Sequence, residues 1–167
     1  PTYSHERFHD TIDAVQSLLN QTYEEKEILL VVDRDQQLYS RIKAAVPSSV
    51  NVVTCDKPGV SEARNTGIMH ANGEIVAFLD DDAVADRSWL SAIVREYGEP
   101  DVVGVGGYVK PLWVDGRRDL LPEELYWIIG CTYVGHPEGK CAVRNVIGAN
   151  ISFRGDVLRK THLFDAN

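Results

Sequence analysis

The stretch that decides the fold is residues 73–83, GEIVAFLDDDA. A turn signal, Asn72-Gly73, precedes an apolar run that has the length and composition of a buried strand. Three carboxylates follow where such a strand would end. In open α/β sheets, ligands bind beyond the carboxyl ends of the strands. The stretch therefore predicts an α/β fold with an acidic ligand site directly after residues 75–79.

The three carboxylates favour a divalent cation. Side chains alternate along an extended backbone, so Asp80 and Asp82 would point to one side and Asp81 to the other. Close like charges repel, and oxygen-only ligands suit Mg²⁺ or Mn²⁺, which shares its remaining positions with waters and substrate phosphates. A solvated acidic turn or a helix N-cap is the alternative, because Asp is common at both.

Strand-like and helix-like segments alternate on both sides of this stretch. Residues 27–33, EILLVVD, form a second apolar run that ends in a carboxylate. Further strands are expected over 50–54, 102–108 and 145–154, and helices over 7–19, 37–46, 61–70 and 88–97. This alternation predicts a three-layer α/β/α sandwich with a mostly parallel central sheet. Glycines 104, 106 and 107 would allow close backbone approach.

Two segments of this pattern need separate interpretation. Arg64 lies on the helix before the acidic strand and could aim its guanidinium at an anion, with a solvated surface arginine as the alternative. Residues 111–140 mix charged and aromatic residues and break the alternation. We interpret them as a variable insert within a single domain of residues 1–167.

Composition excludes several classes of protein. The chain has 167 residues, of which 44% are hydrophobic and 25% charged, as in soluble globular proteins. A net charge of −8 argues against a nucleic-acid binder. Three cysteines without a C-x-x-C pair, and the lack of a signal peptide or long apolar run, favour a reducing, cytoplasmic location. Dinucleotide-binding, zinc-protease and serine-hydrolase motifs are missing from the sequence.

Taken together, six short motifs resemble the inverting, nucleotide-sugar-dependent glycosyltransferases of family 2, which have the GT-A fold. In chain order they are PTY (1–3), NQTY (20–23), VVD (31–33), GVSEARNTG (59–67), GEIVAFLDDD (73–82) and GANISFR (148–154). The resemblance covers essentially the whole chain and implies a transferase that moves a sugar from a nucleotide sugar, expected to be a UDP-sugar.

The resemblance also implies residue roles. Residues Pro1, Thr2, Tyr3 and Asp33 would hold the base and ribose, and Arg64 and Asn65 would lie near the nucleotide. Asp80 would bind ribose or a metal-bound water, Asp82 would be the direct ligand of Mg²⁺ or Mn²⁺, and Asp81 would support its neighbours. Residues Gly148, Ala149 and Asn150 would lie on the acceptor side. The cation would neutralise charge on the leaving nucleoside diphosphate.

Three departures from the family pattern add expectations. The domain is expected to lack its apolar first strand, before Pro1, and its C-terminal part. Asp33-Arg34-Asp35 replaces the usual D-G-S, which leaves the second nucleotide contact unassigned. An inverting transfer needs a base that deprotonates the acceptor hydroxyl. The catalytic residue is therefore expected beyond Asn167, and neither His162 nor Asp165 is assigned that role.

Residues 122–135 faintly resemble archaeal and bacterial members that extend lipid-linked sugars. An apolar, aromatic stretch around Trp127 would suit a polyprenyl-phosphate-linked acceptor and peripheral association with the cytoplasmic face of a membrane. Ordinary core packing of this segment is the alternative. Two other functions stay open: a nucleotide-sugar-binding or scaffolding domain without catalysis, and a nucleotidyltransferase, although the basic glycine-rich phosphate loop of the latter is not found.

Overall fold

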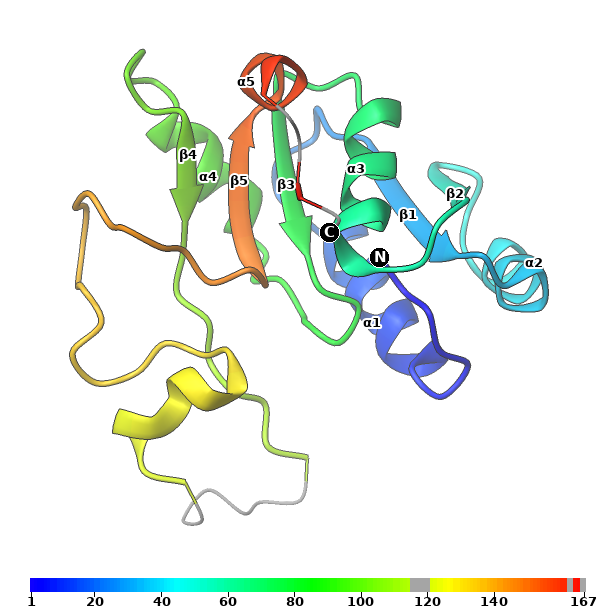
Figure 1. Ribbon diagram of the computed structural model, residues 1–167, viewed down its shortest axis with the longest axis horizontal. Helices are drawn as coiled ribbons and strands as arrows, with labels where there is room; N and C mark the ends of the chain where they lie inside the picture. The colour runs from blue at the N-terminus through cyan, green and yellow to red at the C-terminus, as the bar shows by residue number, and fades with distance from the viewer. Residues whose placement is uncertain (115–120, 162–163, 166–167) are drawn as a thin grey trace.

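The computed structural model describes residues 1–114, 121–161 and 164–165 (Figure 1). The helices are α1 (Phe8–Leu19), α2 (Gln36–Ala45), α3 (Val60–His70), α4 (Trp89–Glu96), the 3₁₀ helix η2 (Glu123–Ile129) and α5 (Gly155–Lys160). The strands are β1 (Ile28–Asp33), β2 (Val50–Cys55), β3 (Ile75–Leu79), β4 (Gly104–Gly106) and β5 (Asn150–Arg154). The predicted bounds are confirmed to within one residue from α1 to α4. Strands β4 and β5 are shorter than predicted.

The strands form two groups. β1 and β2 are parallel, in a register that runs from Ile28 opposite Val50 to Asp33 opposite Cys55. β5 lies between β3 and β4 and is antiparallel to both. In Figure 1 the arrows of β1, β3 and β4 point broadly the same way, and that of β5 points against them. The predicted α/β fold with a mostly parallel sheet is confirmed, with β5 as the reversed strand.

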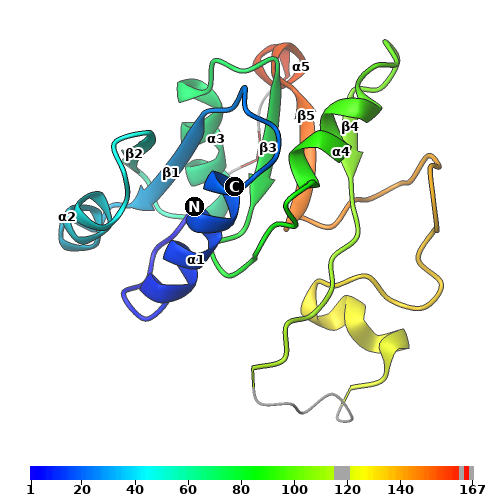
Figure 2. The ribbon, with the colours of Figure 1, turned by 180° about the vertical axis from the view of Figure 1, so that it is seen from behind.

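The layers follow from the alternation of side chains along β1. Leu30 and Val32 pack with Val15 of α1 and with α2, whereas Val31 faces the other way and packs with Ala63 of α3. Figures 1 and 2 show α3 on one face of the strands and α1 and α4 on the opposite face. The helix–sheet–helix layering expected from the sequence is therefore present.

A cavity lies between the two groups of strands. It has a volume of about 570 Å³ and is lined by Ile28 and Val31 of β1, by Val76 and Phe78 of β3, and by Pro1. Among the described strands, β1 and β3 are not hydrogen-bonded to each other. The edge of β3 toward the cavity is therefore unpaired among the described strands, and that of β1 is paired only near its end, where Thr2 bridges Val32.

The glycines of β4 permit a close approach, as predicted. A Cβ atom on Gly104 would lie 2.7 Å from Cδ1 of Phe153, and one on Gly106 would lie 2.6 Å from Cγ1 of Val146. Real Cβ contacts are not this short, so glycine at these positions lets β4 approach Phe153 of β5 and Val146, which precedes β5.

Among the described residues, the predicted insert is tied to the rest of the chain at Thr132 and at Lys140, whose ammonium pairs with Glu96 of α4 and with Glu99. Backbone and side chain of Thr132 make two hydrogen bonds to the backbone of Val109, both 2.9 Å long. Beyond this, η2 and its flanks expose large apolar side chains, among them Leu112 and Trp127. Residues 115–120 of the insert, as well as His162 and Asn167, lie outside the described residues. No helix in the described ranges is long and apolar enough to cross a membrane.

Candidate donor site

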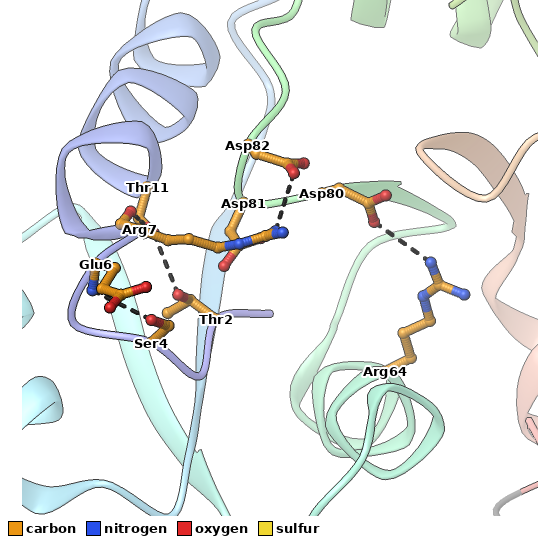
Figure 3. Close-up of polar contacts among 9 residues, drawn as sticks. All are labelled: Thr2, Ser4, Glu6, Arg7, Thr11, Arg64, Asp80, Asp81 and Asp82. Carbon is orange, nitrogen blue, oxygen red and sulfur yellow. Dashed lines mark hydrogen bonds and ion pairs between the residues drawn. The ribbon is translucent and has the colours of Figure 1, made fainter. Parts of the chain in front are cut away.

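Three chain segments that are far apart in sequence meet where β1 and β3 end (Figure 3). They are the N-terminal residues that lead into α1, the acidic loop, which we define as Asp80–Asp82, and the end of β1. The end of β1 is joined to the N-terminal residues because the Asp33 backbone N–H donates to the Thr2 carbonyl oxygen. Arg64 reaches the same place from α3. The edge predicted from the acidic strand is therefore a point of convergence, as expected for a ligand site in an α/β fold.

Arg7 neutralises part of the acidic loop. Its Nη1 lies 3.0 Å from Oδ1 of Asp81 and 2.9 Å from Oδ2 of Asp82. The hydrogen bond to Asp81 raises the pKa of the Arg7 guanidinium above its already high ordinary value, and the nearby Asp82 adds to this. The two carboxylates differ in environment: the Asp81 side chain is 5% exposed, whereas that of Asp82 is 49% exposed.

Arg64 approaches the loop from the other side. Its Nη2 donates to Oδ1 of Asp80 at 3.4 Å and to the carbonyl oxygen of Gly148 at 3.3 Å. Its guanidinium also lies 5.5 Å from the ring centroid of Phe164. The Arg64 side chain is only 16% exposed, so the alternative of a solvated surface arginine is wrong. Arg64 connects the acidic loop to the predicted acceptor side.

Asn65, the neighbour of Arg64, points elsewhere. Its Nδ2 donates to the carbonyl oxygen of Phe164 and its Oδ1 accepts from the Phe164 backbone N–H, both at 2.9 Å. The Asn65 side-chain amide therefore hydrogen-bonds both backbone groups of Phe164, as the backbone of a neighbouring strand would. Its predicted place near the nucleotide stays a prediction.

Asp33 ends β1 beside the first turn of α3. Its Oδ2 accepts from the backbone N–H of Gly59 at 3.3 Å, and its Oδ1 accepts from the Cys55 thiol at 3.7 Å. Burial, and then the neighbouring Asp33 carboxylate, raise the pKa of that thiol, which therefore stays a protonated donor. These contacts fix Asp33 at the edge where the sequence predicted it.

The N-terminal residues divide into a buried anchor and an exposed ring. Thr2 is buried; its backbone bonds to both Val31 and Asp33, and its Oγ1 accepts from Thr11 at 3.2 Å. Tyr3 is 64% exposed, and the Arg7 guanidinium lies 5.7 Å from the centroid of its ring. Tyr3 is thus the aromatic surface that a base could stack on, whereas Thr2 positions the segment.

The predicted acceptor-side residues form the turn into β5. The Gly148 carbonyl is held by Arg64, and Ala149 follows it in the turn. Asn150 accepts from Trp89 Nε1 at 2.9 Å and donates to the carbonyl oxygen of Tyr108 at 3.1 Å. The Asn150 side chain therefore ties β5 to α4 and to the segment between β4 and the insert.

The donor atoms of the acidic loop fit a hard divalent cation. All are carboxylate oxygens, and Oδ2 of the buried Asp81 has no hydrogen-bond partner within the described part of the chain. The described residues contain no ready-made group of three or more His, Cys, Asp or Glu ligands. Mg²⁺ is commonly bound by one or two carboxylates together with substrate phosphates. The loop fits a site that a diphosphate completes.

Comparison with known proteins places this arrangement in a family. The model of glycosyl transferase family 2 matches residues 1–161. The chain belongs to this family. A Haloferax volcanii protein named glucosyl-dolichyl phosphate glucuronosyltransferase is 39% identical over 99% of the chain. The alignment covers 54% of that relative, so the chain spans about half of its length.

Solved structures confirm the GT-A glycosyltransferase fold. Mannosyltransferase PcManGT from Pyrobaculum calidifontis, solved with GDP-Man and Mn²⁺, superposes with a TM-score of 0.69 over 98% of the chain and 46% of its own, at 18% identity. Residues 1–349 of S. aureus TarS with UDP-GlcNAc superpose with a TM-score of 0.62, over 94% of the chain and 45% of theirs, again at 18% identity.

Two residues of the site were missed in the sequence. Arg7 lies at the start of α1, 74 positions from Asp81, and Phe164 lies 99 positions from Asn65. The sequence signal for Arg7 was a cationic residue four positions after Tyr3 in a chain that also has three adjacent carboxylates needing a counter-charge. Phe164 carried no signal, because an apolar residue beside an acid is common.

Proposed function

We propose that this family 2 glycosyltransferase moves a sugar from a UDP-sugar to an acceptor hydroxyl, with inversion and with the help of Mg²⁺ or Mn²⁺. One observation carries the proposal. The acidic loop lies between the guanidinium groups of Arg7 and Arg64 (Figure 3). The exposed Tyr3 lies beside Arg7, and the backbone of Asp33 bonds to that of Thr2. Such a constellation has a surface for a base, acceptors for ribose hydroxyls and oxygen ligands for a cation on a diphosphate.

The roles follow the geometry of each side chain. Tyr3 would stack on the base and Asp33 would accept from the ribose, in a segment that Pro1 and Thr2 hold in place. Asp80, oriented by Arg64, and the exposed Asp82 would hold the cation, and Asp81 would keep the loop in shape. When bound, the cation supplies Lewis-acid stabilisation of the leaving diphosphate.

Inversion needs one in-line displacement, in which a general base takes the proton of the acceptor hydroxyl. We propose that this base lies beyond Asn167 in the parent protein. Residues 1–167 alone would then bind the donor without efficient transfer. The names of the solved neighbours support metal and nucleotide sugar in general, since one was solved with GDP-Man and Mn²⁺ and the other with UDP-GlcNAc.

For the acceptor we propose a polyprenyl-phosphate-linked sugar, reached at the cytoplasmic face of a membrane by peripheral association. The name of the Haloferax volcanii relative includes a dolichyl phosphate. The insert exposes Trp127 and Ile128 by 59% and 58% of their surfaces. The three cysteines are free thiols, in keeping with a reducing compartment.

We also propose that a further strand of the catalytic domain lies in the cavity between β1 and β3. The parallel bridge between Thr2 and Val32 supports this, because backbone running up to Pro1 in the same direction would lie along β1. Hydrogen exchange of a longer chain from the parent gene tests it. Slower exchange at β3 amides would support the strand, and unchanged exchange there would contradict it.

Titration calorimetry tests the donor site. UDP is titrated into the wild type, with and without Mn²⁺, and into Asp82→Ala; Asp101→Ala, an exposed acid on another loop, is the control. We expect Mn²⁺-dependent binding that falls by about 100-fold in Asp82→Ala, on the scale of losses at metal sites, and persists in the control. Binding that ignores Mn²⁺, or no binding by folded wild type, would contradict the proposal. GDP in parallel tests the choice of base.

A further inference from the structure

One nitrogen of Arg7 contacts two adjacent carboxylates of the acidic loop. Nη1 lies 3.0 Å from Asp81 and 2.9 Å from Asp82. An arginine guanidinium keeps its charge at all ordinary pH values. The acidic loop therefore already holds one permanent cation, and it comes from α1 rather than from solvent.

The two halves of this contact are unequal. The Asp81 side chain is 5% exposed, and its Oδ2 has no partner in the described residues, so losing Arg7 would leave a buried carboxylate without its cation. The Asp82 side chain is 49% exposed, and ion pairs in contact with solvent contribute little. The Arg7–Asp81 ion pair should therefore persist, whereas Asp82 can leave Arg7 for another cation.

We propose that Arg7 is the resident counter-cation of the acidic loop and a positioning residue for donor binding. Arg7 holds Asp82 in the metal-free protein. Asp82 leaves Arg7 when a divalent cation binds, while Arg7 stays on Asp81. This inference rests on the proposed function, since it requires Asp82 to be a ligand of the cation.

The release of Asp82 from Arg7 affects whether Mn²⁺ can bind before UDP. Arg7 on Asp81 would repel a divalent cation held by the adjacent Asp82, because both are positive. A diphosphate between them would reduce this repulsion. The wild type should therefore bind Mn²⁺ weakly alone and more tightly with UDP. Without the charge of Arg7, Mn²⁺ should bind more tightly alone and depend less on UDP.

The test is the sign of the change in Mn²⁺ affinity. Binding of Mn²⁺ alone is followed by the electron paramagnetic resonance signal of the free ion, in wild type, Arg7→Gln and Arg7→Lys. Gln keeps hydrogen-bond donors for Asp81 without the charge, and Lys keeps the charge. The control is Arg95→Gln, which removes an equal charge from an exposed site on α4.

We expect Arg7→Gln to bind Mn²⁺ about fivefold more tightly than wild type, the scale of a partly exposed ion pair. Arg7→Lys and Arg95→Gln should stay close to wild type. A residue that merely supports the loop would give the opposite sign, because its loss would weaken Mn²⁺ binding. Equal or weaker binding by folded Arg7→Gln therefore overturns the inference.

If Arg7→Gln is too unstable for the binding measurement, melting temperatures in EDTA and in Mn²⁺ provide a second test. We expect Arg7→Gln to melt lower than wild type in EDTA, and Mn²⁺ to raise it more than it raises wild type. An equal Mn²⁺-induced rise in both proteins overturns the inference. If wild type shows no Mn²⁺-dependent UDP binding, the donor site fails as well; if it does and only the Arg7 effects are missing, the donor site stands.

Discussion

The N-terminal part of the molecule and the predicted insert differ in how their apolar side chains are covered. Around β1 and β2, Leu38, Ile42 and Val50 are fully buried in one continuous core. In the insert, Leu112 is 79% exposed and Val114 is 96% exposed. Apolar residues in the first region stabilise the fold, whereas those in the second lie on a surface that the described residues leave uncovered. The same residue type should therefore have different effects in the two regions.

A pair of identical substitutions, one in each region, gives the largest expected difference. Leu38→Ala removes a fully buried side chain and should lower the free energy of unfolding by about 3 kcal/mol, from lost transfer energy and the cavity left behind. Leu112→Ala should change it by less than about 0.5 kcal/mol. Urea denaturation followed by circular dichroism measures both. Similar losses in the two variants would mean that the insert is packed in solution.

The elements of the N-terminal part could be predicted because their signals are local. Residues 75–79 form the strand expected from one apolar run, and the acidic loop follows it directly. Asp33 could be placed for the same reason, at the end of a second apolar run. These predictions needed only the period of a strand and the rule that strand ends meet at one edge.

The hydrogen-bond partners of the predicted residues could not be predicted from local signals, because they come from distant parts of the chain. Asn65 bonds to Phe164, and Asn150 to Trp89 and Tyr108, across dozens of residues. The close packing of β4 also depends on tertiary contacts, since a Cβ atom at position 104 or 106 would meet the side chain of Phe153 or Val146. Alternation alone predicted a longer strand there.

Asn65 tests whether a residue predicted for donor binding is structural. Asn65→Ala should lower the free energy of unfolding by about 2 kcal/mol, since it removes two hydrogen bonds to the Phe164 backbone at about 1 kcal/mol each. The control is Asn51→Ala, on an exposed position of β2. Thermal melting measures stability, and calorimetry measures UDP binding in the same proteins.

The two readouts separate the roles of Asn65. A loss of stability without a change in UDP affinity would make Asn65 a clamp for the segment around Phe164. Weaker UDP binding at unchanged stability would restore the role that the family resemblance implied. Loss of both would mean that the clamp holds Arg64 in place, since Phe164 lies against its guanidinium.

The smallest expected effect concerns the exposed apolar surface of the insert. Trp127→Ala should weaken binding to vesicles that carry a polyprenyl-phosphate-linked sugar by about fivefold, because an exposed aromatic ring then loses its contact with the membrane. Its stability should stay unchanged. Met69→Ala, which removes a 70% exposed side chain from α3, should leave both properties as they are. Co-sedimentation with vesicles measures the binding.

The acceptor and the membrane can be told apart by repeating the Trp127 experiment on vesicles without the lipid-linked sugar. Equal weakening on both kinds of vesicle would assign Trp127 to the membrane surface itself, and weakening only on the loaded vesicles would assign it to the acceptor. Unchanged binding of Trp127→Ala on both would remove the lipid surface from the proposal. The core-packing alternative would then require Trp127 to be buried in the parent protein, because it is exposed among the described residues.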